Sequence, residues 1–208
     1  MKIVVVSSPK DQPNEVAEVI KMFDLGLEYF HVRKPKMGRK QLNEFIRQFP
    51  ERYRERIIIH SYHSLCFSLK LGGIHLSRKH RKRGKFYQFK LFLRRTFGRK
   101  IIVTRTFHKL TDLTTDKRRY SYTFLSPVFD SITQSTLSAG FSKRALLIMI
   151  PQAKQPVFAM GGVSYDRLSD VANLGFEGAV FLGSIWNAKE KPHEVFQRAL
   201  LEEVDKFD

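Results

Sequence analysis

The chain has 208 residues, of which 42% are hydrophobic and 27% charged, as expected of one globular domain with a full core. No apolar stretch approaches the ~18 residues that span a bilayer. The apolar run Ile3–Val6 is also too short for a signal peptide. A single cysteine, Cys66, excludes an internal disulfide. We therefore expect a cytoplasmic protein that is not bound to membranes.

The formal net charge of +17 is the unusual feature of the composition. No Asp or Glu occurs between Arg56 and Thr111, and nearly half of the segment 78–100 is Lys or Arg. Such a field attracts polyanions, namely nucleic acid or a phosphorylated ligand, but it is equally typical of a solvated basic face. Aromatic residues recur in this segment at the spacing of a buried helix (Phe86, Phe89 and Phe92), which makes nucleic-acid binding the less favoured interpretation.

Eight short apolar runs recur along the chain at regular intervals. They are rich in β-branched and aromatic residues, as expected of parallel strands buried on both faces. The predicted strands are Ile3–Val6, Tyr29–Val32, Ile57–Ile59, Gly73–Leu76, Ile101–Val103, Tyr122–Leu125, Val157–Met160 and Gly178–Leu182.

Segments with helical spacing of apolar residues separate these strands, for example Val16, Val19, Ile20 and Phe23. Three glycines, Gly26, Gly72 and Gly175, stand where a helix should end in a left-handed residue. The alternation predicts an α/β protein, a single (β/α)8 TIM-barrel domain over residues 1–208. An open doubly wound sheet is the alternative. It would normally show a glycine-rich turn after the first strand, and the segment 7–9 is Ser-Ser-Pro.

Small residues follow the last two predicted strands and suggest a phosphate site. Gly161 and Gly162 follow the seventh strand and precede Ser164, a candidate helix N-cap, while Gly183 and Ser184 follow the eighth. In TIM barrels the loops after these two strands commonly bind phosphate through backbone amides and helix N-termini. The simpler explanation is that the glycines only make tight turns.

Four histidines lie at or near predicted strand ends: His31, His60, His75 and His108. His75 lies within an apolar strand, so we interpret it as structural. His108 ends a polar segment, 104–108, interpreted as a loop at the mouth of the barrel. It is the best candidate for a general acid/base, because imidazole titrates near neutral pH.

The second predicted strand contributes a candidate anion ligand. His31 and Arg33 alternate along it and should project to one side, where Arg33 can hold a phosphate or carboxylate. No metal site is evident, because Asp130 is the only acidic residue that follows a strand end and Mg²⁺ prefers carboxylates. The sequence also contains no P-loop, CxxC or HExxH motif.

Six segments in this order resemble the thiamine-phosphate synthase/TenI family over nearly the whole chain. Each is weak alone, and their order carries the resemblance. They are Phe30–Arg33, Leu71–Leu76, Thr106–His108, Ser126–Phe129, Ala159–Val163 and Gly175–Val180.

The synthase branch of that family joins a pyrimidine pyrophosphate to thiazole phosphate with Mg²⁺. Four of its positions differ here. Its Asn-Asp pair after strand three corresponds to His60-Ser61, and its metal-binding Asp after strand four corresponds to His80. Two of its lysines correspond to Pro35, flanked by Lys34 and Lys36, and to Gln134. Both expected Mg²⁺ ligands are therefore replaced.

The TenI branch, whose characterised members are thiazole tautomerases without a metal site, resembles the chain more closely. The resemblance implies that His108 is the acid/base and that Gly161, Gly162, Gly183 and Ser184 hold the phosphate. It implies further substrate contacts from His31, Arg33, His60, Thr106, Ser131 and Thr133. The expected ligand is thiazole phosphate or a related phosphorylated small molecule, with no cofactor.

Two alternatives and one question of assembly stay open. A divergent thiamine-phosphate synthase would require Mg²⁺. A non-catalytic binder of a phosphorylated ligand or nucleic acid would use the basic segment 78–100. The sequence leaves open whether the chain forms a homodimer.

Overall fold

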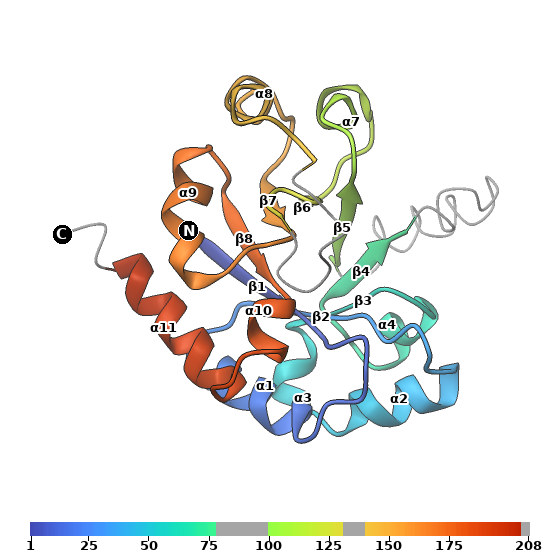
Figure 1. Ribbon diagram of the computed structural model, residues 1–208. Helices are drawn as coiled ribbons and strands as arrows, with labels where there is room; N and C mark the ends of the chain where they lie inside the picture. The colour runs from blue at the N-terminus through green and yellow to red at the C-terminus, as the bar shows by residue number, and fades with distance from the viewer. Residues whose placement is uncertain (78–99, 131–139, 205–208) are drawn as a thin grey trace.

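Eight parallel strands form a closed barrel in the computed structural model, and each strand pairs with its neighbours in chain order (Figure 1). The structure describes residues 1–77, 100–130 and 140–204. The strands are β1 (Lys2–Val6), β2 (Tyr29–Val32), β3 (Ile57–Ile59), β4 (Gly73–Leu76), β5 (Ile102–Phe107), β6 (Tyr122–Leu125), β7 (Val157–Met160) and β8 (Gly178–Phe181). The prediction of a (β/α)8 barrel is confirmed.

Helices lie around the outside of the barrel (Figure 1). They are α1 (Glu15–Asp24), α2 (Arg39–Arg47), α3 (Glu51–Arg54), α4 (Ser64–Ser68), α7 (Thr111–Thr115), α8 (Lys143–Met149), η1 (Tyr165–Arg167), α9 (Leu168–Asn173), α10 (Gly183–Trp186) and α11 (Pro192–Val204). None of the helices in the described ranges is long and apolar enough to cross a membrane.

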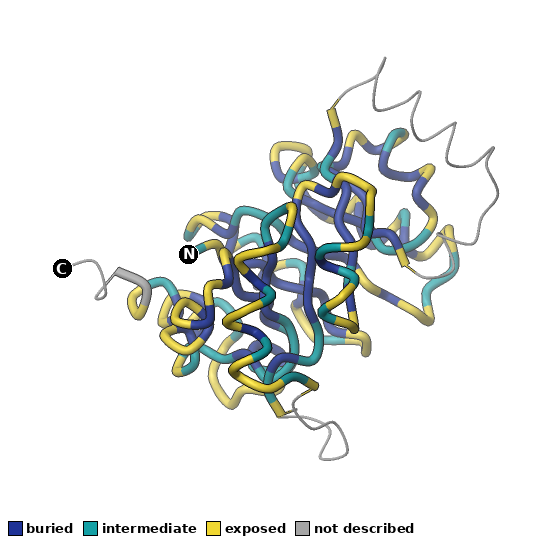
Figure 2. The backbone as a smooth tube through the Cα atoms, turned by 90° about the horizontal axis from the view of Figure 1, so that it is seen from above, coloured by how far each residue is buried: buried dark blue, intermediate teal, exposed yellow. Residues whose placement is uncertain are grey.

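Strand side chains alternate between two cores, which explains the nearly continuous apolar runs. One set fills the lumen and comprises Val4, Val6, Ile58, Tyr122, Phe124, Phe158 and Val180. The intervening residues, such as Ile3 and Val5, pack outward against the helices. Figure 2 shows the result, with buried strands inside a partly exposed outer layer. The lumen is thus filled by side chains, and any ligand has to bind at an end of the barrel.

The structure corrects two local predictions. Residues 104–107 belong to strand β5 and not to a loop, so Thr104 and Thr106 are placed on the barrel wall. Gly26 and Gly175 have the predicted positive φ, at 108° and 84°, but Gly72 is not among the residues with positive φ. A Cβ at Gly72 would lie 2.1 Å from the carbonyl oxygen of Glu55, so close packing is what requires glycine there.

Candidate active site

Three histidines cluster in the lumen near the carboxyl ends of β2, β3 and β4. They are His31, His60 and His75. The Nδ1 atom of His31 is 3.1 Å from Nε2 of His60, and its Nε2 is 2.7 Å from the hydroxyl of Tyr122. His75 contacts the hydroxyls of Thr104 at 2.9 Å and Thr106 at 3.1 Å. Through these hydrogen bonds, the polar side chains in the lumen are paired with one another although the surrounding core is apolar.

Burial favours the neutral form of two of these histidines, His31 and His60. Desolvation, followed by the proximity of His75, holds the pKa of His31 well below its ordinary value, and the pKa of His60 is lowered in the same way. The positive charge of Arg33 lowers the pKa of His60 further. Neutral imidazoles suit the observed contacts, because each ring then offers one donor and one acceptor.

Three clustered imidazoles raise the question of a metal ion. Their nitrogen atoms lie within 4.8 Å of one another, and this is the one such group among the described residues. The rings of His60 and His75, however, are stacked, with centroids 4.0 Å apart and planes only 9° from parallel. A metal ion binds in the plane of an imidazole lone pair, so one ion cannot lie in both ring planes. The arrangement fits a hydrogen-bonded network better than a metal site.

His108 lies directly after β5 and is exposed at the same end of the barrel. Its Nδ1 atom is 2.8 Å from the carbonyl oxygen of Ser126, at the end of β6. Because a carbonyl only accepts hydrogen bonds, Nδ1 carries the proton in the neutral ring and Nε2 carries the lone pair. No hydrogen bond to Nε2 occurs among the described residues, so this atom can exchange a proton with a ligand.

His31 and Arg33, the pair predicted on the second strand, differ in burial. Strand β2 ends at Val32, so Arg33 lies just beyond the strand and is exposed, whereas His31 is fully buried. The amide of Arg33 donates to Ser7 Oγ at 2.7 Å. The two side chains thus do not share one environment. Arg33 lies at the rim of the barrel, where its side chain has access to solvent.

The next residue, Lys34, is unavailable for binding a ligand. Its side chain is 3% exposed and forms an ion pair with Glu15, whose carboxylate also accepts a hydrogen bond from the amide of Ser8 at 3.0 Å. The Lys34 ammonium donates a further hydrogen bond to the carbonyl of Lys10 at 3.2 Å. This buried pair joins α1 to the segment after β2. Lys34 therefore cannot replace the lysine missing at Pro35.

The glycines after β7 have a structural explanation. Gly161 and Gly162 have φ of 94° and 65°, a region that residues with a Cβ rarely adopt. A Cβ on Gly162 would lie 2.2 Å from the carbonyl oxygen of Asp130. The amide of Phe129 donates to Gly161 at 3.1 Å, so the loop after β6 packs directly on this turn. Glycine is required here whether or not an anion binds.

After β8, Ser184 is the more informative residue. Its hydroxyl oxygen is buried and has no hydrogen-bond partner. Among the described residues, only one other buried side-chain atom lacks a partner, namely Gln155 Nε2. Helix α10 is a single turn, and the indole of Trp186 fixes it to the carbonyl of Val6 at 2.7 Å. Residues 183 and 184 begin this turn, so their amides have no intrahelical acceptor.

The remaining site residues are of three kinds. Thr106 is partly buried in β5 and contacts His75. Ser131, Thr133, Gln134 and His80 lie outside the described residues, as does the basic segment 78–99. Ser164 occupies the predicted N-cap position before η1, but its side chain makes no capping bond.

Sequence reasoning missed the role of Tyr122, whose hydroxyl contacts His31 from across the lumen. Tyr122 appears in the sequence only as one apolar residue of a strand. Residues 31 and 122 are far apart in the sequence and come together only when the barrel closes, so no local sequence pattern predicts their contact.

We expect Gly162→Ala to destabilise the fold by about 2–5 kcal/mol, because both the positive φ and the contact with Asp130 oppose a Cβ. Urea unfolding measures this change. The matched control is Gly38→Ala, where the Cβ would meet only Gln41 Oε1 at 3.6 Å, and a loss below about 1 kcal/mol is expected. Equal losses in both variants would show that the packing of the turn on the β6 loop is not tight.

Comparison with known proteins defines the chain first by fold. A thiamine phosphate pyrophosphorylase from Bacteroides thetaiotaomicron has 25% sequence identity and a TM-score of 0.76, with 98% of each chain covered. A thiamine phosphate pyrophosphorylase from Pyrococcus furiosus has 15% identity and a TM-score of 0.76, covering 100% of this chain and 97% of that one. A 3-hexulose-6-phosphate synthase follows at 14% identity and a TM-score of 0.68, covering 97% and 99%. The last two likenesses concern the fold alone.

The family follows from a sequence model described as thiamine monophosphate synthase, which matches residues 3–185. The chain belongs to this thiamine-biosynthesis family of TIM-barrel proteins. No curated protein sequence matches it.

Proposed function

We propose that this protein is a metal-independent thiazole tautomerase of the TenI type, acting on a thiazole phosphate at the mouth of the barrel. The observation that carries the proposal is His108, which is exposed at the end of β5 and held through Nδ1 by the Ser126 carbonyl. This contact leaves Nε2 as the basic atom. A tautomerisation requires one group that removes a proton and returns it at another position, and a neutral imidazole does both.

The phosphate would bind at the ends of β7 and β8. Two features support this location, namely the unpartnered Ser184 hydroxyl and the amides of the residues that begin α10. A phosphate oxygen would supply the missing partner of Ser184. The glycines at 161 and 162 do not add to this argument, since packing alone requires them.

The other substrate contacts would come from the opposite side of the mouth. The substrate of TenI-type tautomerases is a thiazole carboxylate phosphate, and Arg33, which is exposed at the rim, can pair with its carboxylate. His60 is partly buried beside it and neutral, so it can form a hydrogen bond with the ring. His31 contacts His60, and Thr106 contacts His75, so both would hold the histidine cluster in place beneath the ligand.

A divergent thiamine-phosphate synthase is the second candidate, because the family model and two of the structures described above carry synthase or pyrophosphorylase names. That reaction would require Mg²⁺. The residue at position 61 is Ser, whose hydroxyl is a weaker ligand for a hard cation than a carboxylate.

Calorimetry with the pyrimidine pyrophosphate separates the two candidates. We expect weak binding that Mg²⁺ does not strengthen by more than about twofold, since Ser61 and His80 replace the carboxylates that would hold the ion. The double variant Ser61→Asp/His80→Asp is the control that should gain Mg²⁺-dependent binding. Tight, strictly Mg²⁺-dependent binding by the natural protein would favour the synthase instead.

A further inference from the structure

A concave surface lies at the opposite end of the barrel from His108. The segments 116–120 and 154–156 precede β6 and β7, and together they line a groove of about 560 Å³. We call this the basic groove. Because all eight strands are parallel, the residues that precede them lie at the far end from the loops that follow them. The volume is within the range of small-molecule sites.

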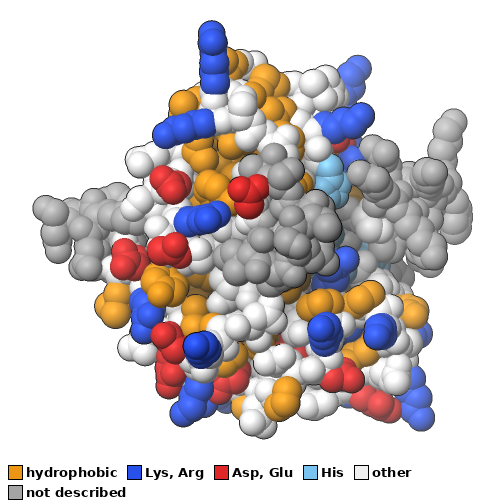
Figure 3. All heavy atoms as spheres, in the orientation of Figure 1, with side chains coloured by type: hydrophobic (Ala, Val, Ile, Leu, Met, Phe, Trp, Pro, Cys, Tyr) orange, Lys and Arg blue, Asp and Glu red, His pale blue; other side chains and the backbone are white. Residues whose placement is uncertain are grey.

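Charge is the first property of the basic groove. Four of its side chains are cationic and exposed, namely Lys117, Arg118, Arg119 and Lys154. Among the described residues none of the four side chains takes part in an ion pair. Figure 3 shows Lys and Arg side chains projecting from the upper part of the molecule, while over its middle and lower parts acidic and basic side chains are mixed.

The one acidic residue of the groove does not offset this charge. Asp116 is paired with the guanidinium of Arg105, which is itself buried. The same carboxylate accepts a hydrogen bond from the Tyr120 hydroxyl at 3.2 Å and from the amide of Arg118 at 2.9 Å. Its charge is therefore compensated within the wall, and the four exposed cations remain uncompensated.

Gln155 is the second, independent observation. Its Oε1 accepts a hydrogen bond from the amide of Tyr120 at 3.0 Å, which fixes the orientation of the side-chain amide. Its Nε2 is then the donor end, and this atom is buried without a partner. A buried donor that lacks an acceptor costs free energy, and an anionic oxygen would remove that cost once it displaces the groove side chains that cover Nε2.

We propose that the basic groove binds a small phosphorylated anion with two or more phosphate groups, held by Arg118 and Lys154 and accepting a hydrogen bond from Gln155. The proposal does not depend on the function proposed for the barrel mouth. The groove is concave and of limited volume, so a compact ligand fits it better than an extended nucleic acid.

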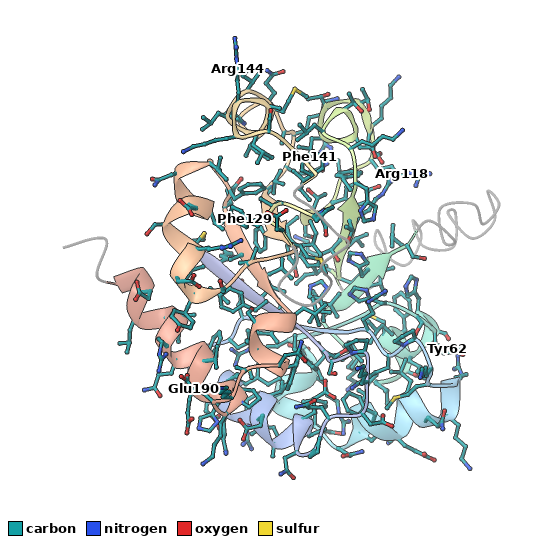
Figure 4. All side chains as sticks on the ribbon, in the orientation of Figure 1. Tyr62, Arg118, Phe129, Phe141, Arg144 and Glu190 are labelled. Carbon is teal, nitrogen blue, oxygen red and sulfur yellow. The ribbon has the colours of Figure 1, made fainter. Side chains whose placement is uncertain are left out.

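Inorganic triphosphate is the probe, titrated by calorimetry into the full chain at low ionic strength. We expect Arg118→Gln/Lys154→Gln to weaken binding about tenfold or more, since charge-assisted hydrogen bonds are lost. The matched control is Lys143→Gln/Arg144→Gln on α8, which removes the same charge from exposed positions outside the groove. Figure 4 shows Arg118 beside α7 and Arg144 on α8, both pointing outward from different parts of the surface. The control should change affinity less than about twofold.

Gln155→Glu tests the donor directly. It keeps an acceptor for the Tyr120 amide but replaces the donor with a repelling carboxylate, so binding should be lost while the thermal midpoint shows that the fold remains. In the natural protein, the side-chain NH2 signals of Gln155 should shift on addition of triphosphate.

Four results would overturn the proposal. They are the absence of binding by the natural protein, equal weakening in both double variants, displacement of triphosphate by thiazole phosphate, and displacement by an RNA duplex that binds more tightly. The second would indicate only diffuse attraction by the net charge. The third would place the ligand at the barrel mouth.

Discussion

His108→Asn should lower the rate of thiazole tautomerisation by about 10²–10⁴-fold and leave the affinity for thiazole phosphate nearly unchanged. Asparagine can still donate a hydrogen bond to the Ser126 carbonyl, in place of Nδ1, so the loop after β5 should keep its position. The substitution removes the far edge of the imidazole ring, including the basic Nε2 atom. Steady-state kinetics and calorimetry with the same substrate measure the two effects separately.

The neighbouring exposed residue provides the control for this variant. Lys109→Asn introduces the same side chain one position further on and should change neither rate nor affinity more than about twofold. Loss of binding in His108→Asn without a separate loss of rate would make His108 a positioning residue. An unchanged rate would remove His108 from the mechanism.

The second large effect expected is a loss of stability in mild acid. His31 and His60 have folded-state pKa values well below 6.5, so they stay neutral in the fold while the unfolded chain binds protons. The stability that they contribute is therefore complete above about pH 6.5 and falls as the pH decreases below it. Each group can contribute up to about 1.4 kcal/mol per pH unit in that window.

Urea unfolding at pH 7.5 and 5.5 measures this dependence. His60→Asn removes one titrating group, so the loss of stability between the two pH values should be reduced by roughly half. The other titratable or charged groups around the pair stay unchanged in this variant; they are His63, His75, Tyr122 and Arg33. His108→Asn is the control, because its exposed ring lies outside the cluster. A natural protein that is equally stable at both pH values would show that the cluster is hydrated or protonated in the fold.

The barrel could be predicted because its signal is local and repeated. Each strand is a short run such as Ile57–Ile59, and barrel closure buries both faces of every such run. The strand bounds were wrong mainly at β5, where Thr104 and Thr106 looked like loop residues. They are hydrogen-bonding partners of His75 in the lumen, and a polar residue within a strand is explained only by a partner on another strand.

The candidate site was predictable in its location and less so in its details. Chain order placed His108 and the glycines after β7 and β8 at one end of the barrel, as the topology of parallel strands requires. The fixed tautomer of His108 depends on a carbonyl from the next strand, which no sequence pattern encodes. The burial of Glu15, which pairs with Lys34, could be predicted from the sequence. Glu15 is four residues before Val19 and therefore lies on the same, buried face of α1.

The most direct test of the central claim is to follow the conversion of the less stable thiazole phosphate tautomer by NMR, with pure protein and a metal chelator present. A metal-independent tautomerase should convert it much faster than the spontaneous reaction, at a rate that added Mg²⁺ does not change. Conversion at the spontaneous rate with and without Mg²⁺, together with thiamine phosphate formation once the pyrimidine pyrophosphate is added, would contradict this account.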